Sequence, residues 1–269
     1  MASSQSATGL GRVLEGKVAI ITGAGRGIGE VSARVFSQAG ARLTLAARTT
    51  AEVEKVAAAV NDMGGEAIAV TTDIADPKSV DAMVKAALNR YGTVDILVNN
   101  AAIPGKDAYI EDAPLEQWEQ AIRVDLFGTF NCCHAVVPIL KQKRSGRILI
   151  LSSTVIHDPI VRKTHYVAAK TGLVGLCRTL ALELAPYNIT VNTVTPGAVD
   201  GQLLVNYMKR LANEQGKTYE EFRKQFESPI PMKRFVQPED IAYMEVFLSS
   251  DLACNITGVE IPVDGGGSI

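Results

Sequence analysis

Short runs of apolar residues recur along the chain, and segments with the apolar spacing of helices lie between them. Most runs are nearly continuous in Val, Ile, Leu and Ala and do not alternate with polar residues. This pattern is typical of strands buried on both faces, as in a parallel sheet with helices on either side. The predicted strands cover residues 18–21, 42–46, 67–70, 95–98, 147–151, 190–194 and 259–263.

Residues that begin or end helices lie between these runs. Asp76-Pro77 combines an N-cap residue with proline at the first helical position. No repeat or low-complexity linker divides the chain of 269 residues. We therefore predict one doubly wound, Rossmann-type α/β domain over residues 17–269, with a parallel sheet of about seven strands. Glycines that we expect at helix C-termini are Gly40, Gly64, Gly92 and Gly146.

Two segments depart from the repeating pattern. Residues 1–16 are rich in Ser, Ala and Gly, and we expect a flexible N-terminal arm there. Some forty residues lie between Gly197 and Pro238, with a polar helical stretch among them. An insert after a late strand falls at the carboxyl edge of the sheet, where ligands bind in such folds. We expect a helical lid over about residues 200–235, and the alternative is a solvated helical excursion.

A glycine-rich turn joins the first predicted strand to the following helix. Its sequence is Thr22-Gly23-Ala24-Gly25-Arg26-Gly27-Ile28-Gly29. Glycines here let the backbone approach a phosphate group, and the helix N-terminus adds free N–H groups and a positive dipole end. The spacing is Thr-Gly-x-x-x-Gly-x-Gly rather than Gly-x-Gly-x-x-Gly. Alone it indicates either a nucleotide site or a flexible turn.

Tyr166 and Lys170 lie four residues apart at the start of a predicted helix, so their side chains share one side of it. Ser153 follows the strand at 147–151 and therefore lies at the same sheet edge as the glycine turn. An ammonium about 4 Å away contributes roughly 4 kcal/mol, enough to lower a tyrosine pKa from about 10 to about 7. Tyr166 is predicted to exchange protons at neutral pH, with Ser153 bonded to a substrate oxygen. The alternative is an ordinary helix face.

With these residues in place, the sequence resembles the short-chain dehydrogenase/reductase family over almost all of residues 17–266. The resemblance implies a seven-stranded Rossmann-type sheet that binds NAD or NADP. It also implies hydride transfer between C4 of the nicotinamide and a carbonyl or alcohol carbon. The matching segments are the Thr22–Gly29 turn, Asp73-Ile74, Asn99-Asn100-Ala101, Ser153, Tyr166 with Lys170, Asn192 to Gly197, and Val263 to Gly266.

The resemblance implies roles for single residues. Tyr166 would be the general acid/base, and Ser153 would orient the substrate oxygen. Lys170 would lower the pKa of the tyrosine and hold the nicotinamide ribose. The implied cofactor-binding residues are Gly23, Arg26, Gly27, Ile28 and Gly29 in the turn, Asp73, Ile74 and Asn100 around the adenine and ribose, and Pro196, Gly197 and Val199 beside the nicotinamide, together with Tyr166 and Lys170.

Three positions depart from the family pattern. Asp125 stands where the family usually has an asparagine that holds a water of the proton relay, and we count it among the catalytic residues. Ala102 replaces a usual glycine, and Gly201 replaces a usual threonine that touches the carboxamide. These changes affect the relay and the grip on the nicotinamide but leave the Tyr–Lys pair intact.

The residue after the second strand bears on the choice of cofactor. An NAD enzyme usually has an acidic residue there, which accepts hydrogen bonds from the ribose 2′-OH. This chain has Ala47 followed by Arg48. Arginine offers a 2′-phosphate a planar fork of donors, and Arg26 lies within reach of the same phosphate. We therefore predict NADP rather than NAD; the alternative is that Arg48 is a solvent-facing residue.

Composition narrows the partners. A net charge of −2 leaves no basic surface for nucleic acid or anionic lipid. Of four cysteines two are adjacent, which argues against a disulfide framework and for a reduced, cytoplasmic protein. We recognise no signal peptide and no membrane span. The three histidines lack metal-ligand spacing, so we expect no metal.

The helix expected over residues 115–143 forms an oligomer face in the family. Trp118, Phe127 and Phe130 lie on it, and we assign them to interface and core packing. The resemblance thus implies a homo-oligomer, either a dimer or a tetramer.

Three functions remain open from the sequence. The first is an NADP-dependent oxidoreductase acting on a small-molecule ketone or secondary alcohol. The second is a dinucleotide-binding regulatory protein with weakened catalysis. The third is a reductase of 3-oxo groups bound to acyl carrier protein, which predicts a basic docking patch beside the site. Lys141, Lys143 and Arg144 are candidates for it, although cations at a helix C-terminus also complement its dipole.

Overall fold

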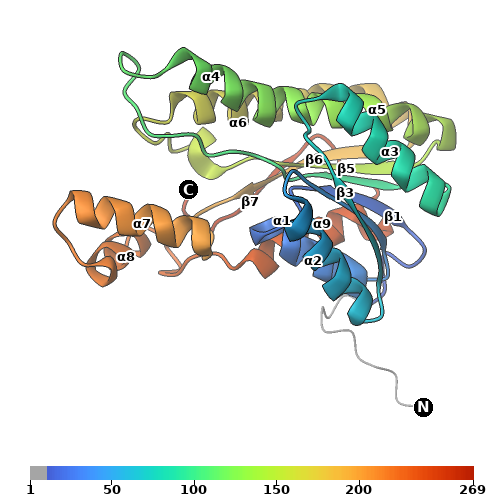
Figure 1. Cartoon of the computed structure of the whole chain (residues 1–269), viewed down its shortest axis with the longest axis horizontal. Coiled ribbons are helices and arrows are strands. Elements are labelled where there is room, and N and C mark those ends of the chain that lie inside the picture. The colour runs from blue at the N-terminus through green and yellow to red at the C-terminus, as the bar shows by residue number, and fades with distance from the viewer. Residues whose placement is uncertain (1–10) are drawn as a thin grey trace.

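The computed structural model describes residues 11–269 (Figure 1). A parallel sheet of seven strands forms its centre, in the order β3-β2-β1-β4-β5-β6-β7. Each strand lies within two residues of its predicted bounds. They are β1 (Val18–Thr22), β2 (Arg42–Ala47), β3 (Glu66–Thr71), β4 (Ile96–Asn99), β5 (Gly146–Leu151), β6 (Ile189–Pro196) and β7 (Glu260–Val263).

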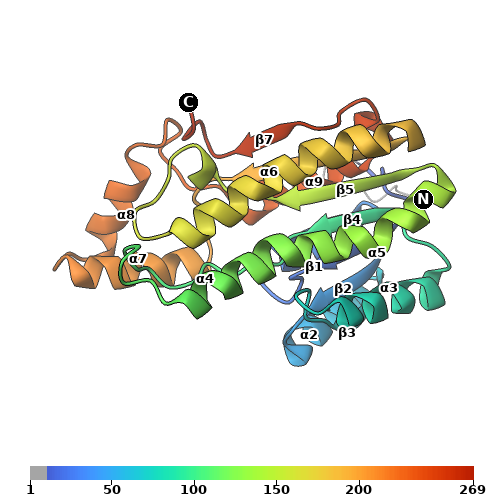
Figure 2. The same cartoon turned by 90° about the horizontal axis from the view of Figure 1, so that it is seen from above.

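Helices cover both faces of the sheet (Figure 2). One face packs against α1 (Gly27–Gln38), α2 (Thr50–Asp62) and α9 (Pro238–Ser249). The other packs against α3 (Pro77–Tyr91), α5 (Gly128–Lys143) and α6 (Thr164–Leu184). Because successive strand residues point to opposite faces, Ala19 and Ile21 enter the first core and Ile20 the second.

The predicted helix ends are confirmed with one exception. Asp76 caps α3 by accepting the Lys78 N–H, and Gly92 closes that helix with a φ of 75°. Gly146 does not end α5, because Arg144 adopts the left-handed conformation there and Gly146 already begins β5. An added Cβ at Gly146 would lie 2.7 Å from Leu140, so close packing explains this glycine.

The predicted N-terminal arm is too long. Leu14 is fully buried in the core beside α1, and its N–H donates to the Ala39 carbonyl at 2.9 Å. Residues 12–16 are therefore packed against the domain. The part of the predicted arm before residue 11 lies outside the described residues.

The helix expected over residues 115–143 has three parts. α4 (Leu115–Ala121) and α5 are joined by a π-helical turn, Ile122–Phe127. This turn contains Asp125, whose backbone carbonyl accepts a hydrogen bond from the Thr129 hydroxyl at 2.9 Å. Single π-helical turns inside α-helices occur frequently at functional sites.

The insert after β6 contains two helices, α7 (Gln202–Glu214) and α8 (Tyr219–Glu227). They project together from the main body at the carboxyl edge of the sheet (Figure 1). The insert has a small core of its own, so it is a folded unit rather than a solvated excursion. The buried residues of this core are Met208, Ala212, Phe222, Ile230 and Phe235.

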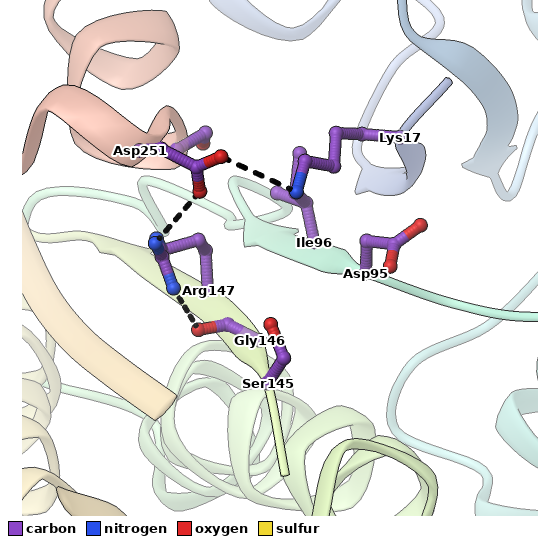
Figure 3. Close-up of a pocket in the computed structure, with 8 residues that line it drawn as sticks. Lys17, Asp95, Ile96, Ser145, Gly146, Arg147 and Asp251 are labelled. Carbon is purple, nitrogen blue, oxygen red and sulfur yellow. Dashed lines mark hydrogen bonds and ion pairs between the residues drawn. The ribbon is translucent and has the colours of Figure 1, made fainter. Parts of the chain in front are cut away.

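The amino edge of the sheet is closed by charged side chains (Figure 3). Arg147, at the start of β5, pairs with Asp251 at 3.2 Å and donates to the Gly146 carbonyl. Lys17 lies 3.7 Å from the same Asp251, and Asp95 accepts a hydrogen bond from the Val18 N–H at 2.8 Å. The hollow between them has a volume of about 10 Å³, room for about one water molecule. This hollow is therefore too small for a ligand larger than water.

Within residues 11–269, no helix is long and apolar enough to cross a membrane. The same part of the chain holds no cluster of three or more His, Cys, Asp or Glu side chains arranged to hold a metal ion.

Candidate active site

The glycine turn after β1 forms a tight, open-faced cradle. Gly23 has a φ of 66°, and an added Cβ there would lie 2.7 Å from the Ala101 Cα. A Cβ at Gly29 would lie 2.4 Å from the Gly23 carbonyl oxygen. At Gly27 the φ is 60°, and an added Cβ would meet no atom within 4 Å. There is thus no room for side chains at Gly23 and Gly29, where the turn packs on the protein, whereas the side of the turn at Gly27 is open.

The N-terminus of α1 opens onto this cradle. Arg26 is the N-cap residue, and its side chain makes no capping hydrogen bond. The first N–H groups of α1 therefore lack a side-chain acceptor and are available to an anion. The turn and the helix start together fit the phosphates of a dinucleotide.

Asn100 and Thr22 fasten the turn to the end of β4. The Asn100 side-chain amide donates to the carbonyls of Thr22 at 2.8 Å and Gly23 at 3.1 Å. The Thr22 hydroxyl accepts the N–H groups of Asn100 and Ala101. The sequence analysis placed Thr22 at the start of the glycine motif but gave it no role, because its hydroxyl meets Asn100 and Ala101 only in the fold.

The side of the cradle toward β2 and β3 carries the predicted adenosine residues. Arg48 follows β2 directly and is exposed, and Asp73 and Ile74 follow β3. The Arg26 guanidinium lies 3.9 Å from the Glu52 carboxylate of α2. Sequence reasoning missed Glu52, because only the fold brings the first turn of α2 beside the glycine turn.

Ser153, Tyr166 and Lys170 lie at the carboxyl edge beside the cradle. Ser153 begins a single 3₁₀ turn after β5, and its hydroxyl accepts the Val155 N–H at 3.5 Å. Tyr166 and Lys170 lie on the first turns of α6, and the Lys170 ammonium is 5.7 Å from the centre of the Tyr166 ring. The helix spacing has therefore brought the phenol and the ammonium together as predicted.

The charges around Tyr166 differ from the prediction. Burial and the nearby Asp125 raise the pKa of Tyr166 to about 12, and a hydrogen bond with Ser153 offsets this only in part. The Lys170 ammonium donates to the Leu151 carbonyl at 2.8 Å. Burial lowers the pKa of Lys170 itself. Within the chain alone, the phenol is therefore a proton donor at neutral pH.

Asp125 is buried beneath this pair, with a relative exposure of 1%. One carboxylate oxygen accepts the Ile103 N–H at 2.8 Å, and the other has no hydrogen-bond partner among residues 11–269. Burial raises the pKa of Asp125, while Lys170 and the Ile103 N–H lower it in part. The unpartnered oxygen places a buried acceptor in the electrostatic field of Lys170 and Tyr166.

The end of β6 forms the remaining wall. Gly197 donates its N–H to the Val263 carbonyl at 3.0 Å, and an added Cβ there would lie 2.8 Å from the Asp264 Cβ. Pro196 ends β6, and Val199 pairs with Val236 at the root of the insert. These residues lie at the carboxyl edge, as the sequence predicted.

The basic residues considered for docking lie elsewhere. Lys143 forms an ion pair with Asp95, and Lys141 and Arg144 lie over the Tyr187 ring at the end of α5. They precede β5 and so belong to the amino edge, opposite the glycine turn. They do not form a basic patch beside the site.

Fold and cradle together define a dinucleotide-binding protein of the Rossmann type. A family model described as "Enoyl-(Acyl carrier protein) reductase" matches residues 23–268. The 3-oxoacyl-[acyl-carrier-protein] reductase FabG of Thermotoga maritima is 34% identical over 94% of this chain and 98% of its own length.

Two solved structures are similar throughout. Levodione reductase has a TM-score of 0.90 at 31% identity, covering 94% of this chain and 98% of its own. The 3-ketoacyl-(acyl-carrier-protein) reductase from Brucella melitensis, complexed with NADH, has a TM-score of 0.84 at 38% identity, covering 95% and 100%. The chain belongs to the short-chain dehydrogenase/reductase family, whose members are NAD(P)-dependent oxidoreductases acting on CH–OH or C=O groups.

Proposed function

We propose that this protein transfers hydride between NADP(H) and a small ketone or secondary alcohol. The observation that carries the proposal is the grouping of Ser153, Tyr166 and Lys170 beside the open glycine cradle at one sheet edge. A bound nicotinamide would supply or accept the hydride at C4. A regulatory role without turnover is less well supported, because all three of these side chains are present.

The proposed roles follow from the contacts of each side chain. Tyr166 gives its phenolic proton to the oxygen of the substrate carbonyl, and Ser153 bonds the same oxygen. With its pKa raised to about 12, Tyr166 is protonated at neutral pH and so can donate a proton to the carbonyl oxygen. Lys170, fixed on the Leu151 carbonyl, holds the nicotinamide ribose. Asp125 holds the Ile103 N–H and adds negative charge beneath the pair.

The test of this assignment is Tyr166→Phe, which keeps the ring and removes its proton. Carbonyl reduction should fall by about 10²- to 10⁴-fold, the usual effect of losing a positioned acid. NADPH binding should persist. It is measured by the change in NADPH fluorescence when the protein is added. Tyr187→Phe, at the opposite edge of the sheet, is the matched control. Near-normal turnover in the Tyr166 variant would exclude the proposed acid.

We infer NADP rather than NAD from the basic residues around the adenosine end. Arg48 and Arg26 are both exposed and offer charged donors to a 2′-phosphate, while Glu52 competes for Arg26. Arg48→Ala should raise the KM for NADPH by roughly 10- to 100-fold, because a charge-assisted contact is worth about 1.5–3 kcal/mol. The KM for NADH should change little.

Two comparisons complete this cofactor test. Arg34→Ala, in α1, serves as the control for loss of a surface arginine near the same helix. A wild-type preference for NADH would leave Arg48 as a surface residue and refute the NADP assignment.

A second candidate substrate is a 3-oxoacyl group on acyl carrier protein. It is favoured by the names of the relatives from Thermotoga maritima and Brucella melitensis. The position of Lys141, Lys143 and Arg144 at the far edge gives it no docking patch. Comparing kcat/KM for one 3-oxoacyl group on the carrier protein and on a short thioester decides between the two substrates.

We also propose that the protein is cytoplasmic and assembles as a dimer or tetramer.

A further inference from the structure

The inner face of α7 is tied to the body of the protein by charge. Arg210 and Glu214 lie four residues apart on that helix and bond to one another at 2.7 Å. Arg210 also pairs with Asp107, and Glu214 lies 3.8 Å from Arg162. Among the described residues, these are the ion pairs that join α7 to the rest of the chain. A second arginine of the insert, Arg223, pairs within the insert, with Asp200 and Glu227.

Asp107 is the centre of this network. It lies in the connection between β4 and α4, and its side chain is only 5% exposed. The Lys163 ammonium lies 2.7 Å from its carboxylate, and Arg210 bonds the other oxygen. Burial would raise the pKa of Asp107, but hydrogen bonds from Lys163 and Arg210 outweigh it and lower the pKa. The carboxylate therefore stays ionised and holds both cations at once.

Lys163 extends the network to the proposed acid. It stands directly before α6, three residues ahead of Tyr166. Besides Asp107, its ammonium donates to the carbonyls of Pro104 at 2.9 Å and Gly105 at 3.2 Å. One buried lysine thus joins the β4–α4 connection to the start of the helix that carries Tyr166.

Two residues beside the network adopt the left-handed backbone conformation. Arg162 has a φ of 70°, and its carbonyl accepts the Ala108 N–H at 3.0 Å. Gly105 has a φ of 60°, and an added Cβ would lie 2.2 Å from the His165 ring nitrogen. A non-glycine residue such as Arg162 keeps this conformation only where surrounding contacts hold it, and such residues cluster at ligand clamps. Arg162 and Gly105 lie on the two segments that Lys163 and Asp107 join.

We propose that Asp107, Lys163 and Arg210 form a latch that positions α7 and the β4–α4 connection over the substrate site. The contact between Arg210 and Asp107 is the one that breaks when the latch opens, since Arg210 is half-exposed while Lys163 is buried. Lys163 and Asp107 stay joined when α7 moves away, so the segment before Tyr166 keeps its place. This proposal rests on the proposed function, because it assumes that the substrate beneath α7 is a carbonyl compound.

Arg210→Met tests the latch, because it removes the charge and keeps most of the side-chain length. Asp107 remains paired with Lys163, so the fold should survive. Lys209→Met is the matched control, since Lys209 lies next to it on α7 without an ion pair to the body. Arg210→Lys, which keeps a donor for Asp107, should restore most of the wild-type behaviour.

Two readouts separate the latch from the proposed function. Amide hydrogen exchange of the protein alone should be about 2- to 5-fold faster over α7 in Arg210→Met than in Lys209→Met, the effect of losing one half-exposed ion pair. In turnover, the KM for the carbonyl compound should rise by a similar factor, with the KM for NADPH within twofold of wild type. Exchange equal in the two variants overturns the latch. Faster exchange with an unchanged carbonyl KM overturns its role in positioning substrate.

Failure of the proposed function has a different signature. If the wild type reduces no carbonyl compound, the hydride-transfer proposal fails, whereas exchange over α7 still supports or refutes the latch by itself.

Discussion

Asp125 shows how one residue sets the balance of charge in the site. The two oxygens of its carboxylate have different surroundings. One accepts the Ile103 N–H, and the other is buried without a hydrogen-bond partner among the described residues. An asparagine would keep the first contact, since its carbonyl oxygen also accepts an N–H. Only the negative charge would be lost. That charge raises the pKa of Tyr166 and opposes the lowering of the pKa of Lys170.

Asp125→Asn should therefore shift the pH profile of alcohol oxidation toward acid. Oxidation needs the ionised phenol, and removing a nearby negative charge lowers the pKa of Tyr166. We expect a shift of up to about one pH unit, equivalent to about 1.4 kcal/mol. The measurement is the oxidation rate against pH for both proteins, with Asp81→Asn on the exposed side of α3 as control. An alkaline shift would mean that the carboxylate itself takes part in proton transfer.

The sequence predicted the positions of site side chains that follow from spacing along a helix or strand. It missed the side chains whose positions depend on contacts with distant parts of the chain. Tyr166 and Lys170 share a helix side because they lie four residues apart, and strand ends carry Ser153 to the same edge. The direction of Lys170 toward the Leu151 carbonyl follows from the packing of α6 on β6 beside the end of β5, which no local pattern encodes. Asp107 escaped notice for the same reason.

At the scale of elements, the packing of α1 on α9 buries an unexpected acid. Glu245 on α9 is fully buried and accepts a hydrogen bond from Ser32 on α1, while its other oxygen has no partner. Burial raises its pKa to about 8, with the Ser32 contact opposing this in part. The interface therefore favours the neutral acid, and an ionised form is costly there.

Stability should consequently fall as the pH rises. The unfolded chain loses the Glu245 proton near pH 4.5, whereas the folded chain keeps it to about pH 8. Between these values the folded state binds more protons, so the free energy of unfolding falls by up to roughly 1.4 kcal/mol per pH unit. Glu245→Gln cannot titrate and should gain stability over wild type through this range. Urea unfolding from pH 5 to pH 9 checks this.

Glu54→Gln, on the exposed side of α2, makes the same chemical change without burial and serves as control. A stability difference between Glu245→Gln and wild type that does not vary with pH would contradict the titration of Glu245.

The strands of the sheet were the part of the fold that the sequence predicted best. Strands buried on both faces leave long apolar runs, and all seven are present. The π-helical turn around Asp125 was not foreseen, because one extra residue in a turn barely alters the apolar period of the helix. The separate core of the insert likewise depends on how α7 and α8 meet.

At the scale of the molecule, the outer side of α4 and α5 exposes large apolar side chains. Leu115 is 68% exposed, Phe127 57% and Phe130 48%. Trp118 is tied inward by a hydrogen bond from its indole N–H to the Thr164 hydroxyl. Phe127 and Phe130 lie three residues apart and so share one side of the helix, and exposed apolar surface of this kind marks protein–protein contacts. It supports the proposed assembly of several copies through this side.

Phe130→Asp should therefore produce a smaller species in sedimentation velocity or light scattering, because a charge at an apolar interface is costly to bury. Met63→Asp, at an exposed apolar position directly after α2, is the control and should leave the molecular mass unchanged. A wild-type protein that sediments as one copy of the chain would refute the proposed dimer or tetramer.

The contact between α1 and α9 has a consequence for biosynthesis. α1 follows the cofactor turn near the start of the domain, but α9 spans Pro238–Ser249 and leaves the ribosome some two hundred residues later. Until then the apolar side of α1, including Val31 and Val35, lacks its final cover. The nascent first half of the domain thus offers a binding surface to chaperones throughout most of translation. Fragments that stop before α9 should be insoluble even though they contain the whole glycine turn.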